Sequence, residues 1–512
     1  MNSIFEQNLH RLRSGLMAAF SASILAACAV GPNFHAPEPP STERYTPGPQ
    51  PTSTVSTEEV AGGAAQHFVP EGEVPAEWWR VLHSEPLDEL IERALKNSPT
   101  VASAEATLRS AAESYGGERG ALLLPTVDGS ASATREKTSL ASFGLPNGAT
   151  VYNNQFSASA QVSYRLDVFG GSRRQLEGLR AQTEYQRWEL EAARLLLTGN
   201  IVTTAVNIAS LRAQLAAVAD IVAGERDQLA VTERQFAAGT ASHADVLAQQ
   251  AQLAQTEASI PPLERQLVQA GHRLAVLAGE TPDHEELQGI ALDGLTLPTE
   301  LPVTLPASLI RQRPDVQAAE AQLHQASAQV GVATANLLPA LSLTGSIGSD
   351  STTAQNLLGA GSGVWSIAGS LTQPLFHGGQ LRAERRAALA DLDGAAARYR
   401  ETVLEALQQV ADTLRAIESD ARNLKAQMAA EEAARASLAI ARRQYTAGVN
   451  SHVAVLIAER QYIQARQSRV VAQASRYSDS ATLFQALGGG WWNRNPESPI
   501  TISSLREVGN GH

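Results

Sequence analysis

Two stretches of the sequence decide the fold: QFAAGTASHADVL at residues 235–247 and QYTAGVNSHVAVL at residues 444–456. They lie 209 residues apart and are identical at seven of thirteen positions. In each stretch a glycine ends a long segment, and a serine stands just before a new apolar run. Glycine commonly closes a helix in a left-handed backbone conformation, and serine commonly caps the start of the next helix. Each stretch therefore predicts the tip of a helical hairpin.

The match between the two stretches extends outward in both directions. Residues 97–101 (NSPTV) match 312–316 (QRPDV), and Phe169-Gly170-Gly171 matches Phe376-His377-Gly378. Matches that recur in the same order predict a duplicated unit of roughly 210 residues. We place the first repeat at 76–305, the second repeat at 306–490 and a C-terminal tail at 491–512.

The segments that lead into the two tips predict unusually long helices. Residues 172–238 and 376–448 contain no proline. In the second segment apolar side chains alternate at spacings of four and three, a heptad pattern, at Val403, Leu407, Val410 and Leu414. At 1.5 Å per residue, such a segment forms a rod of about 100 Å. Return helices are expected from Ser242, with Asp245 completing a capping box, and from Ser451.

Earlier in each repeat, a predicted helix (86–122 and 306–337) ends at Leu-Pro and is followed by two strands. Alternating apolar and hydroxylic residues at 156–168, 341–347 and 365–371 predict strands with one apolar and one polar face. Strands of a membrane barrel and strands of a soluble sandwich both fit this pattern. The heptad helices that follow have no place in a sandwich.

The N-terminus indicates export and a lipid anchor. Arg11 and Arg13 precede an apolar run at 16–27, which ends in Leu-Ala-Ala-Cys and predicts a signal peptide at 1–27. Cys28, the only cysteine, stands where a lipoprotein carries its acyl chains; ordinary secretory cleavage is the alternative. Residues 28–75 follow as a proline-rich linker. After Cys28 no run of 18 apolar residues occurs, so we expect no transmembrane helix.

Composition and motifs argue against several functions. The net charge of −12 and the aromatic content of 5% disfavour a nucleic-acid partner. The sequence contains no HExxH, GxSxG or Walker A motif, and the glycines of 359–363 lie in a turn between strands, so we predict neither an enzyme nor a cofactor beyond the covalent lipid. His243 and His452 occupy equivalent positions at the tips, either as a metal or pH-sensing ring or as polar residues that begin a helix. Trp78, Trp79 and Trp365 could anchor at a membrane interface, or the first two could pack after the linker, near the waist of a barrel.

Four strands cannot close a membrane barrel, for which about eight is the minimum. The sheet must therefore find neighbours in other copies of the chain, which predicts an oligomer.

Motifs along nearly the whole chain resemble those of the TolC-like outer membrane factor family, of the NodT/OprM type. They are CAVGPNF at 28–34, Trp78-Trp79, IPPL at 260–263, RQRPDVQAAE at 311–320, PLFHGG at 374–379 and ALGGGW at 486–491. The resemblance implies an α+β protein whose homotrimer forms a 12-stranded transmembrane β-barrel, continued by a 12-helix α-barrel in the periplasm of a Gram-negative bacterium.

The implied function is the outer-membrane exit duct of a tripartite efflux pump for small molecules such as drugs. Its partners would be a periplasmic adaptor protein, outer-membrane lipid and an inner-membrane pump, often of the resistance–nodulation–division class. Two alternatives are a channel for type I protein secretion and, from a different class, a surface-anchored coiled-coil scaffold.

The resemblance also implies roles for residues near the tips. Gly239, Thr240, Gly448 and Val449 would meet the adaptor. Asp245 and Tyr445 match a polar link that holds the periplasmic gate closed, although Asp245 could act only in its capping box.

The acidic ring of the family's gate falls at Ala454 and Ile457, with Val453 beside them, so carboxylates are absent here. Glu459 is expected to point to another face of the helix. We therefore predict an apolar constriction that gates by dewetting.

Overall fold

The computed structural model describes residues 29–38, 41–42, 44–48, 51–57, 60–139, 150–283 and 289–494. The predicted signal peptide, Cys28 and most of the predicted tail lie outside the described residues. The chain divides into two compact units. One comprises 1–37, 107–186 and 318–399, and the other comprises 38–106, 187–317 and 400–512. Each unit thus combines segments from both repeats.

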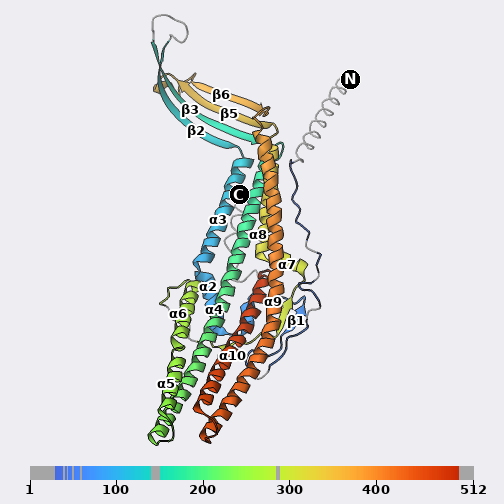
Figure 1. The fold of residues 1–512 in the computed structure, drawn as a ribbon. Coiled ribbons are helices and arrows are strands. Elements are labelled where there is room, and N and C mark those ends of the chain that lie inside the picture. The colour runs from blue at the N-terminus through green and yellow to red at the C-terminus, as the bar shows by residue number, and fades with distance from the viewer. Residues whose placement is uncertain are drawn as a thin grey trace. The chain divides into compact units, whose positions relative to one another are not determined.

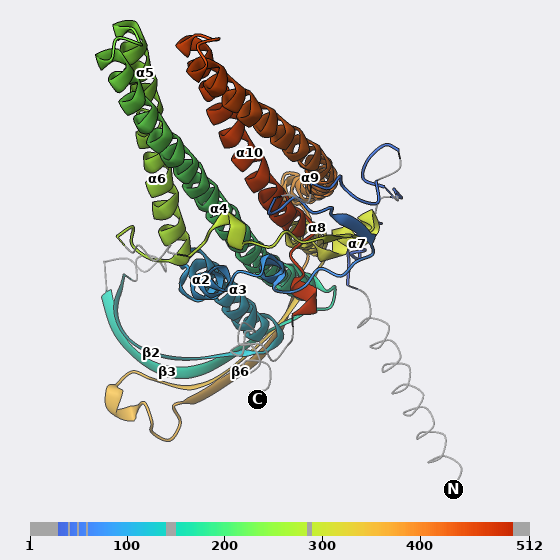
Figure 2. The same cartoon turned by 90° about the horizontal axis from the view of Figure 1, so that it is seen from below.

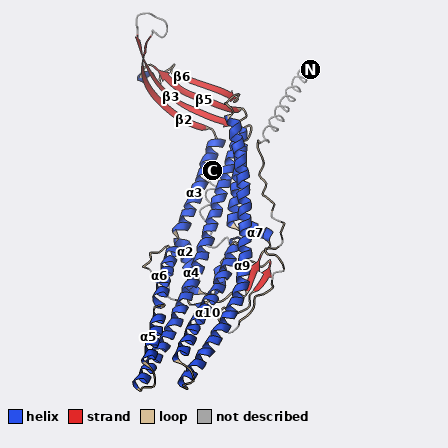
Figure 3. Cartoon of the chain, in the orientation of Figure 1, coloured by secondary structure: helices blue, strands red, loops and turns tan. Residues whose placement is uncertain are grey.

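The first unit contains a four-stranded antiparallel sheet in the order β2 (Thr126–Ser139), β3 (Thr150–Leu166), β5 (Ala340–Ser351) and β6 (Gly363–Thr372), drawn in Figures 1 and 3. One hairpin comes from each repeat. The register pairs Tyr164 with Leu343 and Ile347 with Trp365, so the apolar side chains of all four strands share one face. This arrangement confirms the predicted alternation of apolar and polar residues.

Hydroxyl groups dominate the opposite face of the sheet. Hydrogen bonds join Ser132 to Ser157 (2.7 Å) and Ser346 to Ser366 (2.8 Å) across neighbouring strands. Trp365 and Ile367, on the apolar face, are 76% and 80% exposed. In the described part of the chain, β2 and β6 each pair along one edge only. The sheet therefore presents a wide apolar face and two open edges.

The helices that precede the strands are each broken once, which corrects the predicted continuous helices 86–122 and 306–337. The first consists of α2 (Glu85–Asn97) and α3 (Pro99–Leu123), and the second of α7 (Pro306–Gln312) and α8 (Pro314–Ala335). Ser98 (ψ 122°) and Arg313 (ψ 123°) lie between the pieces in extended conformations. Each precedes a proline, whose ring disfavours the helical conformation of the residue before it.

Helices α4 (Gly171–Ala237) and α9 (Gln380–Thr446) contain 67 residues each, as the heptad pattern predicted. α9 is followed by one return helix, α10 (His452–Ala486). The return from α4 is instead divided into α5 (His243–Glu257) and α6 (Ile260–Ala278), since prolines stand at the start of α6. Figure 2 shows α5 beside α4 and α10 beside α9. Of the described helices, α4 alone has a stretch apolar enough to cross a membrane, but 61% of that stretch is buried in the protein.

The second unit contains a small parallel sheet that we did not predict, because its strands come from distant parts of the sequence. β1 (His67–Pro70) pairs with β4 (Glu300–Val303). β1 falls within the predicted linker, which is therefore partly ordered against the body of the protein. Beside it, the short helix η1 (Trp78–Leu82) buries both of its tryptophans, and Trp78 stacks on Phe484 with ring centroids 5.9 Å apart. These tryptophans are core residues, not anchors at a membrane interface.

The remaining described elements are three single turns of 3₁₀ helix. They are η3 (Leu292–Gly294), η4 (Ala354–Asn356) in the turn between β5 and β6, and η5 (Trp491–Asn493) after α10.

Candidate functional site

The two hairpin tips, Gly239-Thr240 and Gly448-Val449, have nearly the same backbone. Gly239 (φ 74°) and Gly448 (φ 70°) are left-handed, and each is followed by an amide that donates to a carbonyl of the preceding helix, at 2.8 Å and 2.9 Å. A side chain at either glycine would meet no described atom within 4 Å, so the strain of the positive φ is what excludes other residues. Val449 is 76% exposed. The tips therefore offer exposed side chains on a fixed backbone.

The Asp245 side chain forms the predicted capping box with Ser242 at the start of α5. Its carboxylate accepts hydrogen bonds from the Ser242 backbone N–H (3.0 Å) and hydroxyl (2.7 Å), and these bonds lower the pKa of Asp245. The Tyr445 hydroxyl donates instead to Oε1 of Gln235, at 3.2 Å. Within the single chain Tyr445 thus bonds Gln235 of α4, and the gate link from Tyr445 to Asp245 stays a prediction.

The two side chains predicted to form the apolar constriction are accessible. Val453 and Ile457 are 55% and 49% exposed on α10. Glu459, on the same helix, is 2% exposed, and its Oε1 accepts a hydrogen bond from Arg442 at 2.6 Å. Glu459 therefore points into the protein interior and Ile457 toward solvent, which confirms that the two side chains lie on different faces of α10.

The two tip histidines lie on aromatic rings. His452 tilts against Tyr445 at 5.1 Å between ring centroids, and His243 tilts against Phe236 at 5.4 Å. His452 is buried, which lowers its pKa and favours the neutral imidazole. Within the described ranges no three His, Cys, Asp or Glu side chains gather as metal ligands would.

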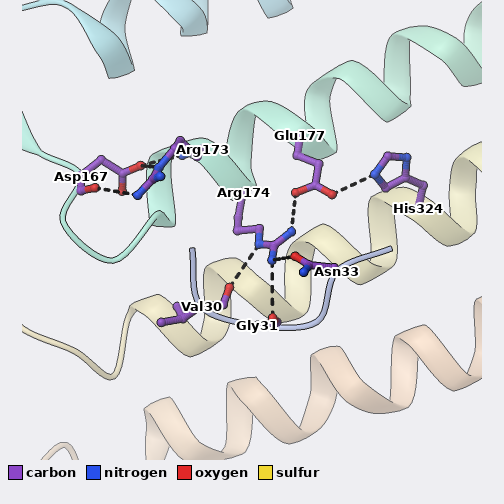
Figure 4. Close-up of polar contacts among 8 residues, drawn as sticks. All are labelled: Val30, Gly31, Asn33, Asp167, Arg173, Arg174, Glu177 and His324. Atoms are coloured by element: carbon purple, nitrogen blue, oxygen red, sulfur yellow. Dashed lines mark hydrogen bonds and ion pairs between the residues drawn. The ribbon is translucent and has the colours of Figure 1, made fainter. Parts of the chain in front are cut away.

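The first described residues form a clamp with the start of α4, which sequence reasoning missed (Figure 4). The Arg174 guanidinium donates to the carbonyls of Val30 (3.1 Å) and Gly31 (3.4 Å) and to Oδ1 of Asn33 (2.7 Å). It also pairs with Glu177 at 2.7 Å. A buried arginine with several acceptors holds a peptide in one register. The clamp therefore fixes the chain two residues after Cys28.

Neighbouring contacts extend the clamp. Glu177 bonds His324 at 2.9 Å, and the His324 ring stacks on Phe34 at 4.2 Å. Val30 donates its backbone N–H to the carbonyl of Phe169, three residues after β3 ends. The only sequence signals were the motif at 28–34 and the arginine pair that follows Phe169-Gly170-Gly171.

A buried polar layer in the first hairpin was also missed. Glu225 on α4 has no exposed surface, and its Oε1 accepts hydrogen bonds from Thr256 (3.0 Å) and Gln252 (3.2 Å) of α5. A lone carboxylate in a heptad pattern resembles any solvated surface position, so nothing local marks it as interior.

Comparison with known proteins relates this architecture to export channels. The family model described as "Outer membrane efflux protein" matches residues 90–280 and 305–489. The pyoverdine export outer membrane protein OpmQ of Pseudomonas aeruginosa is 32% identical over 422 residues, 81% of this chain and 87% of that protein. The solvent efflux pump outer membrane protein SrpC of Pseudomonas putida is 29% identical over 479 residues, 92% of this chain and 97% of that protein.

The solved structure of the outer-membrane channel OprN superimposes with a TM-score of 0.81 at 27% identity, and the match covers 91% of this chain and 100% of that one. The one-sided sheet, the 67-residue helices and these likenesses define an outer-membrane export protein. The chain belongs to the outer membrane efflux protein family, as the sequence motifs predicted.

Proposed function

We propose that three copies of this chain form the exit duct of a tripartite efflux pump. Twelve strands would close a transmembrane β-barrel, and twelve helix segments would continue it as an α-barrel in the periplasm. The observation that carries the proposal is the sheet of β2, β3, β5 and β6. An apolar face and two open edges are unstable in a monomer, and pairing of β2 with β6 of the next copy removes both problems.

Small molecules are the proposed cargo. OpmQ is named for the export of pyoverdine and SrpC for the efflux of solvents. The chain would receive its cargo from a periplasmic adaptor and an inner-membrane pump of the resistance–nodulation–division class, and the tips at Gly239-Thr240 and Gly448-Val449 would meet the adaptor. Their exposure and their nearly identical backbones support this role, because six equivalent tips suit a repeating partner.

A lipid anchor on Cys28 completes the proposal. The clamp at Arg174 holds Val30 to Asn33 beside the residues that follow β3, so acyl chains on Cys28 would start near the end of the sheet. Mass spectrometry of the mature N-terminus tests this part. An unmodified N-terminus at another residue would contradict it.

Single-channel recording in planar bilayers tests the duct itself. We expect discrete conductance steps from the purified oligomer, and native mass spectrometry should give the mass of three chains. Absence of conductance from a correctly folded oligomer would favour a surface-anchored scaffold. Conductance combined with export of a protein, and not of small molecules, would favour a type I secretion channel.

A further inference from the structure

The buried polar layer of the first hairpin consists of Glu225, Gln249, Gln252 and Thr256. Glu225 and Gln249 have no exposed surface, and the Gln249 amide donates to the backbone carbonyl of Glu225 at 3.5 Å. Within the described residues, Oε2 of Glu225 and Oε1 of Gln249 are both buried without a hydrogen-bond donor. Two buried acceptors without a donor are costly, and a proton on one of them supplies what the layer lacks.

The second hairpin shows that this position does not require polar groups. At the offset of 209 residues, Gln249 corresponds to Ala458 and Thr256 to Ala465. Ala458 lies in an apolar cluster with Leu438, Ala441 and Val455. The position of Gln249 is thus filled by an apolar side chain in the second hairpin, where the buried carboxylate, Glu459, is instead paired with Arg442.

Glu225 also lies within the electrostatic reach of the second hairpin. α5 packs against α10, and Glu459 of α10 is a buried carboxylate whose Oε2 has no donor among the described residues. From α5 itself, the charge of Glu257 acts on Glu225, and Glu257 is paired with Arg226 of α4 at 2.6 Å. From α9, Arg442 pairs with Glu459. The carboxylates of Glu459 and Glu257 therefore both disfavour the charged form of Glu225. Arg442 and Arg226 are paired with these two carboxylates and not with Glu225.

We propose that Glu225 is a proton-operated joint between the first helical hairpin and α10. With a proton, Glu225 is neutral and donates a hydrogen bond within the layer, so α5 stays packed against α10. Without it, Glu225 is a second buried negative charge beside Glu459, and the repulsion separates α5 from α10.

The electrostatics set the pH at which the joint works. Burial raises the pKa of Glu225 to about 7, the bonds from Thr256 and Gln252 oppose this rise, and the charges of Glu459 and Glu257 add to it. Burial also raises the pKa of Glu459, which its pairing with Arg442 partly offsets. Glu225 therefore changes its charge near neutral pH, unlike an ordinary carboxyl group.

The joint lies 14 residues before Gly239, which is about 20 Å along α4. If the tips form the entrance of the duct, which rests on the proposed function, separation of α5 from α10 widens that entrance as the pH rises.

Infrared titration of the full-length protein in detergent tests the charge change. A buried protonated carboxyl group gives a carbonyl band distinct from that of a carboxylate. We expect such a band at about pH 5 and its loss through about pH 7. In Glu225→Gln the band should lose the part that Glu225 contributes, and the part from Asp420, whose pKa is also raised to about 7, should remain. Glu459→Gln should move the midpoint to lower pH, and Glu257→Gln should move it less, because Glu459 has the larger effect on Glu225. A titration that is unchanged in Glu225→Gln would overturn the proposal.

Hydrogen exchange of the α5 amides tests the mechanical part. The exchange rates are first corrected for the intrinsic pH dependence of exchange. For each unit by which packing of α5 against α10 raises the pKa of Glu225, exchange should be about tenfold faster above the midpoint than below it. Glu225→Gln should stay protected across the range, since glutamine keeps the acceptor and cannot ionise. Titration without a change in α5 exchange would refute the joint.

Neither measurement requires conductance. A protein that titrates and opens as expected, but forms no channel, would contradict the proposed function and leave the joint intact.

Discussion

The two helical hairpins of this chain start from nearly the same sequence signals and end with different interiors. Both long helices have 67 residues, and both tips close on a left-handed glycine. Yet the return from α4 is split into α5 and α6, whereas α10 continues for 35 residues. The first hairpin buries Glu225 and Gln249 where the second packs Ala458 among apolar side chains. Duplication has preserved the signals that shape the backbone, while the side chains between the helices have diverged.

This difference separates two kinds of constraint. The positive φ at Gly239 and Gly448 is a property of the turn, so both repeats must satisfy it. The layer below each tip has only to fill the space between helices. A hydrocarbon layer achieves this with the greatest stability, and a polar layer can respond to protons at some cost in stability.

The largest effect on export is expected from a substitution at the left-handed glycine that closes each hairpin tip. Gly448→Val places a β-branched residue at φ 70°, which strains or rearranges the tip. We expect export to be lost while the oligomer still assembles. The matched control is Gly224→Ala, which also adds a Cβ in open space, but within α4, and should leave export unchanged. Normal export by Gly448→Val would contradict the docking role of the tips.

The next largest effect, on stability, is expected when a carboxyl group is introduced into the apolar cluster of the second hairpin. Ala458→Glu puts a carboxyl group into an apolar cluster without prepared partners, and should destabilise the protein by about 3 kcal/mol or more. Thermal unfolding followed by circular dichroism measures the change. Gln461→Glu, at an exposed position of the same helix, should change stability by less than about 0.5 kcal/mol. Equal effects of the two substitutions would show that the cluster around Ala458 accommodates a carboxyl group as easily as the protein surface does.

The pH dependence of stability sharpens the comparison further. The pKa of Glu225 is about 7 in the folded protein and 4.5 in its ordinary state, so the unfolded chain releases this proton first. Stability should therefore fall as the pH rises from about 4.5 to about 7, by on the order of 3 kcal/mol, and then remain constant. Asp420, beside Asp479, has a raised pKa of about 7 and contributes with the same sign. The difference between the wild type and Glu225→Gln isolates the first hairpin, and parallel curves would exclude its contribution.

A smaller effect is expected at the predicted constriction. Ile457→Asp places carboxylates where exposed isoleucine now stands. In planar bilayers, divalent cations added from the periplasmic side should then block the channel and leave the wild type nearly unaffected. Strong block of the wild type would show that other carboxylates line this end.

The smallest effect should follow from weakening the clamp, which the second repeat does not possess, since Leu381 stands where Arg174 stands in the first. Lysine cannot reproduce the fork of Arg174, so Arg174→Lys should expose residues 29–38 to protease without loss of the fold. Arg180→Lys, on the same helix with a 71% exposed side chain, serves as the control. Equal cleavage of both variants would mean that Arg174 does not hold this segment.

Local signals predicted most of the fold. The long helices follow from heptad spacing and proline-free runs, and the sheet follows from alternation. The breaks at Ser98 and Arg313 were also readable, because each residue precedes a proline. The β1–β4 pair, the Arg174 clamp and the burial of Glu225 were not, since they depend on contacts between distant residues. The capping box of Asp245 was readable from Ser-x-x-Asp, and within the chain Ser242 donates to its carboxylate; the link from Tyr445 to Asp245 stays a prediction.

The Arg174 clamp also brings the backbone of Gly31 close to Gly331 of α8, which has a consequence for biogenesis. A Cβ on Gly31 would lie 2.5 Å from the Cα of Gly331, so two backbones meet there with no side chain between them. Gly331 is 300 positions after Gly31 and is therefore synthesised later than the N-terminal segment. Residues 29–34 must therefore remain undocked until both α4 and α8 have formed. A segment synthesised early therefore docks late, and its docking marks the completion of folding of the subunit.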